Sequence, residues 1–162
     1  MKTISLFLVL FIAFWFSACN LLHEQPNPNM LKCVAVCRND STATDTVFFT
    51  EQSMQYFDTT TNELKINSDF DFNKIMIFNR FVFYLQSDSL FTAQPVTDII
   101  SSTRNDLVLH YNLFDNKLYL EDGYPMHIDN LGFTTQMAQN KAKRAANWKR
   151  FVDRLKVVGK LH

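Results

Sequence analysis

A histidine and a carboxylate near the centre of the chain carry the most obvious catalytic chemistry. His110 and Glu121 lie in two alternating apolar–polar segments that are joined across Asp115-Asn116. Pairing these segments as a hairpin puts His110 opposite Glu121, with Tyr119 on the same polar face. A histidine beside a carboxylate can act as a general base with its orienting partner. No serine or cysteine nucleophile is placed beside the pair, so an exposed cross-strand pair or a binding surface is favoured over a catalytic site.

The second distinctive feature is a basic segment. Residues 141–162 hold eight lysines and arginines and one acid, whereas the rest of the chain from Cys19 onward holds seven basic and fifteen acidic residues. On a helix, Lys149, Arg150 and Arg154 could form a basic face for anionic lipid headgroups, polyanionic glycans or an acidic protein. The alternative is a solvated helix face whose charges compensate the acidic body.

Cys33 and Cys37 raise the question of a disulfide or a metal site. The alternation around them predicts a strand with both thiols on one face, and four strand residues span about 13 Å, which is too far for a disulfide without a bend. No further histidine or cysteine is nearby to complete a metal site. We therefore expect two buried or half-buried thiols, and we expect neither a metal nor a cofactor. The chain also lacks glycine-rich phosphate loops and the common hydrolase motifs.

The first residues of the chain read as an export signal. Residues 4–16 are thirteen uncharged, almost entirely apolar residues preceded by Lys2, which is the length of a signal-peptide core and too short to span a bilayer. Ser17-Ala18-Cys19 follows. We predict a signal peptide over 1–18, a lipidated Cys19 with a flexible tether over 19–29, and a single domain over 30–162. The alternative is an ordinary secretory cleavage site at which Cys19 is one more thiol.

This arrangement resembles small, uncharacterised bacterial lipoproteins. The resemblance rests on residues 16–19, on the segment Tyr56–Leu64, on two central hairpins and on a terminal helix containing Trp148. Phe16 departs from the family pattern, in which leucine, valine or isoleucine is usual. The resemblance implies cleavage before Cys19 and lipid attachment to it, hence an exported protein anchored in the cell envelope at the outer membrane, on its periplasmic or surface face. It implies no defined activity.

The remaining segments predict the elements that position these side chains. Strands are expected over 30–38, 46–50 and 63–67, and one or two helical turns over 50–57. One hairpin pairs 78–86 with 90–94, so that Leu85 faces Phe91, and a second pairs 106–114 with 117–122, so that Tyr111 faces Leu120. A helix whose strongest part is 140–158 follows, with Gly159 as its stop. The predicted fold is α+β: an antiparallel sheet of about five or six strands with one amphipathic helix packed on it.

Three function classes follow from these features. The first is a lipid-anchored, non-enzymatic binding module that uses the basic helix residues and the polar sheet face of His110, Tyr119 and Glu121, with a protein or glycan partner. The second is a periplasmic inhibitor or immunity-type protein whose acidic body meets a basic partner. The third is a hydrolase built on His110 and Glu121. The balanced total charge and the export signal argue against nucleic acid as a partner.

Overall fold

The computed structural model of the chain describes residues 30–37, 45–99, 102–125 and 132–162. The predicted signal peptide, Cys19 and the tether lie outside the described residues. In chain order the elements are β1 (Leu31–Cys37), β2 (Thr46–Thr50), β3 (Met54–Phe57), β4 (Leu64–Ile66), the 3-10 helix η1 (Phe72–Ile77), β5 (Phe78–Leu85), β6 (Asp88–Thr97), β7 (Val108–Asn112), β8 (Lys117–Glu121) and α2 (Phe133–Val157).

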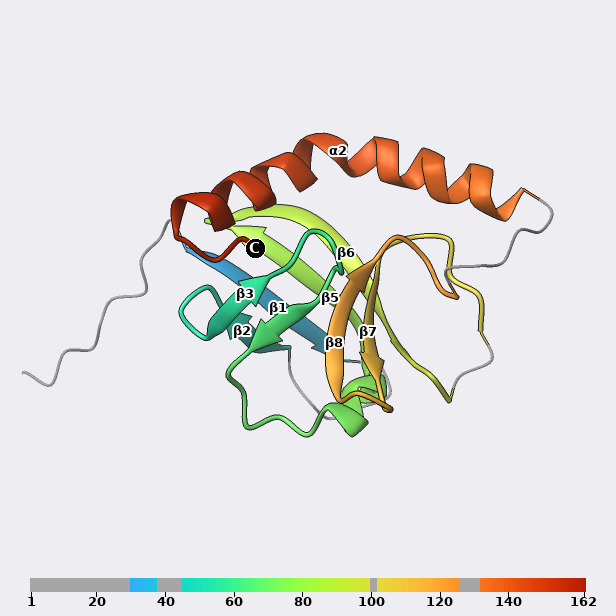
Figure 1. Cartoon of the computed structure of the whole chain (residues 1–162), viewed down its shortest axis with the longest axis horizontal. Helices are drawn as coiled ribbons and strands as arrows, with labels where there is room; N and C mark the ends of the chain where they lie inside the picture. The colour runs from blue at the N-terminus through green and yellow to red at the C-terminus, as the bar shows by residue number, and fades with distance from the viewer. Residues whose placement is uncertain (1–29, 38–44, 100–101, 126–131) are drawn as a thin grey trace, which may run out of the picture.

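These elements form an α+β fold, as predicted. Six strands make one sheet in the order β2-β1-β5-β6-β7-β8, and β3 and β4 make a separate two-stranded sheet. Figure 1 shows α2 running across the top of the molecule, with β3 below its C-terminal part and β7 and β8 below its middle. The six-stranded sheet curls until β8 approaches the turn before β4, where the Leu120 N–H donates to the Asn62 carbonyl at 2.9 Å.

The sheet is mixed, and in this respect the prediction of an antiparallel sheet was wrong. Strand β6 is ten residues long and changes partner along its length. Its first half pairs antiparallel with β5 as far as Ala93, and its second half, from Gln94 to Thr97, pairs parallel with β7. The connection over 98–107 returns the chain to the level of Gln94 before β7 begins. A return of this kind depends on contacts far apart in sequence, which local alternation does not report.

Both hairpins form, but their registers differ from the predicted ones. The difference is two residues in the second hairpin and in the first as far as Phe83, and a further one-residue shift follows between Phe83 and Tyr84. Phe83 faces Phe91, and Leu85 faces Asp88 across a turn in which Gln86 takes a φ of 61°. Tyr111 faces Leu118, and the connecting loop is stabilised by the Asn112 side chain, which accepts the Phe114 N–H at 2.9 Å. A two-residue slip keeps each side chain on its original face. The predicted apolar faces are therefore buried, except that Leu85 and Leu113 are half-buried.

Residues 50–57 form a turn and a strand, whereas helical turns were predicted. Met54 and Phe57, three residues apart, are both buried, which imitates a helical face. In the structure, an irregular pairing between Met54 and Tyr56 shifts the register of β3 against β4, and the shift turns both side chains inward. Two residues that look like one face of a helix thus both point inward from a bulged strand.

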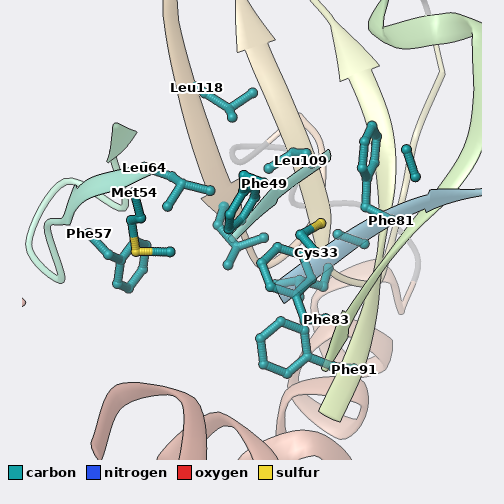
Figure 2. Packing of buried hydrophobic residues seen from close by; sticks show 14 of the residues in the cluster. Cys33, Phe49, Met54, Phe57, Leu64, Phe81, Phe83, Phe91, Leu109 and Leu118 are labelled. Carbon is teal, nitrogen blue, oxygen red and sulfur yellow. The ribbon is translucent and has the colours of Figure 1, made fainter. Parts of the chain in front are cut away.

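Aromatic packing joins α2 to the sheet. Phe151 and Leu155 are fully buried, and the Phe151 ring lies within 6 Å, centroid to centroid, of three other phenylalanines: Phe57, Phe83 and Phe91. In Figure 2, Met54, Phe57 and Leu64 form one end of the buried cluster and Phe81 lies at the other. A buried phenylalanine contributes roughly 3–5 kcal/mol by comparison with alanine, so this packing fixes α2 on the sheet.

The C-terminal end of α2 and the extent of β1 agree with the predictions from the sequence. Gly159 has a φ of 68°, and the Lys160 N–H donates to the Leu155 carbonyl at 2.8 Å, which closes the last turn of the helix. The helix is one to two turns longer at its start than its predicted strongest part. In β1, Cys33 and Cys37 are both buried on one face and are not bonded to each other, as predicted.

Candidate functional site

A pocket of about 460 Å³ lies where α2, the β3–β4 turn and the end of β8 meet. Its apolar wall comes mostly from α2 and is completed by Phe57 at the end of β3. Polar and charged side chains surround this wall. The full lining is Phe57, Thr59, Asn62, Asp122, Lys141, Arg144, Ala145, Trp148, Lys149 and Val152. We call this the Trp148 pocket. An apolar wall with a few polar groups around it is typical of small-molecule sites.

Trp148 is the largest side chain of this pocket and is held by the aromatic core. Its ring packs edge-on against Phe57, with centroids 5.8 Å apart, and tilted against Phe91 at 5.4 Å. The side chain is half-buried. Within the described part of the chain, its indole N–H makes no hydrogen bond. Trp148 therefore offers the pocket both an aromatic surface and a hydrogen-bond donor.

The charged groups of the pocket are held by one another. Arg144 is buried, and its guanidinium donates to Asp106 at 2.6 Å and also to Asp122. The Lys141 ammonium lies 2.7 Å from the other Asp122 oxygen. Burial alone raises the pKa of Asp122, but the hydrogen bonds from Lys141 and Arg144 outweigh it, and the pKa is lowered. Asp122 thus stays ionised near neutral pH and fixes both cations at the mouth of the pocket.

His110 lies in a second polar cluster, between two carboxylates. Its Nδ1 is 3.0 Å from Glu121 Oε2, and its Nε2 is 2.9 Å from Asp98 Oδ1. The predicted proximity of His110 and Glu121 is therefore present, although the register pairs His110 with Tyr119 and places Glu121 on the diagonal. Asp98 was missed because it enters from the end of β6.

The protonation of His110 follows from these contacts. Burial on its own lowers the pKa of His110, but the hydrogen bonds to Glu121 and Asp98 outweigh it and raise the pKa above its usual value. With both ring nitrogens donating, the imidazolium has no lone pair with which to take a proton from a substrate. The nearby Tyr119 hydroxyl donates to Asp115 at 2.6 Å, and burial together with that carboxylate raises the pKa of Tyr119. The geometry matches a structural ion cluster.

The three basic helix residues singled out from the sequence each have a carboxylate partner. Lys149 lies beside Asp153, Arg150 lies 2.8 Å from Asp88, and Arg154 Nε donates to Glu51 at 2.8 Å. These contacts agree with the alternative reading, in which the helix compensates the acidic body. Of the six residues predicted to bind a partner, Lys149 is the one that lines the Trp148 pocket, and their role in binding stays a prediction.

Sequence reasoning missed the centre of the pocket. In the sequence, Trp148 stood out only as part of the predicted terminal helix, and Arg144 is one of the eight basic residues in 141–162. Their meeting with Asp122 and Phe57 depends on the curl of the sheet, so no local pattern signals it. The helical period did give the correct side of α2, because Trp148 and Val152 share the face of Phe151 and Leu155.

Comparisons with protein-family models, with curated proteins and with solved structures found no match. Across the described ranges, no group of three or more histidine, cysteine, aspartate or glutamate side chains is arranged to hold a metal ion. No helix among the described residues is long and apolar enough to cross a membrane.

Proposed function

We propose that this protein is a lipid-anchored component of the bacterial cell envelope whose folded domain is a non-enzymatic binding module. The anchoring part of the proposal is supported by the apolar segment 4–16, the sequence Ser17-Ala18-Cys19 and the polar, proline-containing segment before the domain. Two or more acyl chains on Cys19 would hold the protein stably at a membrane, and the segment 20–29 would give the domain reach.

The Trp148 pocket is the observation that supports the proposed binding function of the domain. Its three cations, Lys141, Arg144 and Lys149, are each paired with a carboxylate, of which only Asp122 lines the pocket, so the paired site favours an uncharged ligand over a strongly charged one. A half-buried indole beside an exposed Ala145 suits the apolar face of a sugar ring, and Asn62, Asp122 and Lys141 can hydrogen-bond its hydroxyl groups. We therefore propose a glycan as the ligand.

Two neighbouring alanines allow a matched test of the pocket. Ala145 and Ala146 are both exposed on α2, but only Ala145 lines the pocket. We expect the full-length chain, purified in a mild non-ionic detergent, to bind one class of envelope glycan in a glycan-array experiment. Ala145→Trp should fill the pocket and abolish that binding, whereas Ala146→Trp should bind as the unmodified chain does. Equal binding by the two variants, or no glycan binding at all, contradicts the glycan proposal.

The anchoring proposal has its own test. Cells grown with a clickable palmitate analogue should incorporate the label into the wild-type chain, and Cys19→Ala should remove it. A labelled Cys19→Ala variant would show that the lipid is attached to another residue. An unlabelled wild type would contradict lipid attachment altogether.

The inhibitor or immunity-type hypothesis remains the second candidate, and the acidic body outside residues 141–162 is the feature that favours it. Chemical crosslinking in intact cells distinguishes it from glycan binding. A single basic hydrolase or toxin crosslinked equally well to the Ala145→Trp variant and to the wild type would support this second hypothesis.

A further inference from the structure

A second pocket, of about 380 Å³, lies at the junction of η1, the start of β5, the second half of β6 and the segment that leads into β7. It shares no lining residue with the Trp148 pocket. Most of its lining residues are polar. The full lining is Met76, Asn79, Arg80, Thr92, Gln94, Pro95, Arg104, Asp106 and Leu107. We call it the arginine pocket.

The two arginines of this pocket differ from the others in the described part of the chain. Arg144, Arg150 and Arg154 each contact a carboxylate. Arg80 and Arg104, the other two arginines that the structure describes, have no such partner there. Two guanidinium groups without a carboxylate partner among the described residues therefore line the same pocket, which favours an anion there.

Arg104 is held in position and has an unsatisfied donor. Its backbone N–H donates to the Tyr124 carbonyl at 2.7 Å and its carbonyl accepts the Tyr124 N–H at 2.8 Å, so the backbone is fixed on both sides. Nη1 donates to the Thr103 carbonyl at 3.3 Å, whereas Nε is buried and has no hydrogen-bond partner among the described residues. A buried charged donor without a partner is costly. Because Arg104 lines the pocket, an oxyanion there would give its guanidinium group the charged partner that it lacks.

The neighbours of the two arginines leave the pocket positive. Arg80 is exposed on β5, and the register that pairs Phe81 with Ala93 places it level with Gln94. The one acid of the lining, Asp106, already accepts Arg144 Nη1 at 2.6 Å and the Leu107 N–H at 2.7 Å through the same oxygen. Asn79, Thr92 and Gln94 supply neutral hydrogen-bonding groups around the two guanidinium groups.

We propose that the arginine pocket binds an oxyanion group through Arg80 and Arg104. A guanidinium presents a planar fork that matches carboxylate, phosphate and sulfate oxygens, and two such forks select an anion over a neutral ligand. The shared chemistry is that of a small oxyanion, which can be a free ion or the acidic group of a sugar. This site is independent of the proposed glycan site, so it stands if the Trp148 pocket binds nothing.

Calorimetric titration of the full-length chain in non-ionic detergent tests the proposal, with inorganic phosphate, sulfate and D-glucuronate as separate probes. At least one probe should bind saturably, and the probe that binds most tightly identifies the source of the oxyanion. Arg80→Gln and Arg104→Gln should each weaken that binding by about tenfold or more, as expected for a lost charge-assisted hydrogen bond. Arg150→Gln, which removes an arginine that is paired elsewhere, should leave it unchanged.

Two results would overturn the proposal: no saturable binding of any probe, or binding that both pocket variants retain at full strength. Arg80 is exposed, so Arg80→Gln keeps the test valid even where Arg104→Gln fails to fold. The Ala145→Trp variant adds a further check, because it should bind the oxyanion normally while it loses the glycan.

Discussion

The contact between Glu51 and Arg154 offers the sharpest test of how the domain is held together. Glu51 is buried in the turn between β2 and β3, and its carboxylate accepts both Nε and Nη2 of Arg154 near the end of α2. Oε2 also accepts the Leu31 N–H at 3.0 Å, and the Glu51 N–H donates to the Leu31 carbonyl at 2.8 Å. One side chain therefore ties together the first strand, a turn and the helix.

Replacing Glu51 by alanine should cost about 3 kcal/mol in the free energy of unfolding. The change leaves the buried Leu31 N–H without its side-chain acceptor, which costs about 1–3 kcal/mol. It also leaves Arg154, whose side chain is 20% exposed, without its bidentate partner. Breaking a fully buried pair costs about 3–5 kcal/mol, and the partial exposure of Arg154 lowers this figure. For a domain of this size, 3 kcal/mol corresponds to a fall of roughly 10 °C in Tm.

Urea unfolding of Glu51→Ala, Arg154→Ala and the double variant measures this contact. The matched control is Asp88→Ala, which removes the carboxylate partner of Arg150 on the same helix. Both side chains of that pair are about half exposed, so the control should cost about 1 kcal/mol or less. If Glu51→Ala costs no more than Asp88→Ala, or if the double variant equals the sum of the single variants, Glu51 and Arg154 do not act as a pair.

The stability that the Glu51–Arg154 contact adds should decrease as the pH falls. Burial alone raises the pKa of Glu51, but the hydrogen bonds from Arg154 and the Leu31 N–H outweigh it, and the pKa is lowered. A lowered carboxyl pKa adds stability that is fully present above the unfolded-state value, about 4.3, and is lost as the pH falls through the folded-state value. The difference between wild type and Glu51→Ala should therefore shrink in acid.

Three further predictions follow from the fold. The raised pKa of His110 adds stability that is fully present below about pH 6.5 and is lost as the pH rises through the folded-state value. The stability difference between wild type and His110→Gln should therefore fall as the pH rises above about 6.5, and a constant difference would contradict the ion cluster. Gly123→Ala should destabilise the domain more than Gly132→Ala. Both glycines have a positive φ, but an added Cβ at Gly123 meets the Arg104 carbonyl at 2.9 Å, whereas Gly132 has open space; equal midpoints in urea would refute the close approach. Cys33 is fully buried and burial raises its pKa, so iodoacetamide should modify it only after unfolding; rapid labelling of the native protein, detected by mass spectrometry, would show that β1 opens.

The faces of the strands could be predicted from the sequence, whereas the registers could not. Alternation with a period of two reports which side of a strand is apolar, and this signal is unchanged when a strand slips by two residues. Leu109, Tyr111, Leu118 and Leu120 are therefore all buried, as the alternation of their segments indicates, although the predicted register of this hairpin was wrong. The register depends on turn details, such as the positive φ of Gln86, which the residue type alone did not specify.

The contacts that form the candidate sites could not be predicted from local sequence patterns. His110 and Asp98 are twelve residues apart and meet because β6 pairs parallel with β7. Arg144 and Asp106 are thirty-eight residues apart and meet because α2 crosses the curled sheet. The basic segment was visible in the sequence, but its division into residues that pair with the body and residues that line a pocket depends on the tertiary fold.

The position of α2 in the chain has a consequence for the order of synthesis. Thirty-six residues separate the end of β8 at Glu121 from the end of α2 at Val157. At roughly 5–20 residues per second, a ribosome needs about 2–7 s to add them. During that interval the strands exist without the helix that buries Phe83 and Phe91 in the finished domain. A chain that ends before α2 therefore leaves an aromatic surface of the sheet uncovered, which favours aggregation and proteolysis.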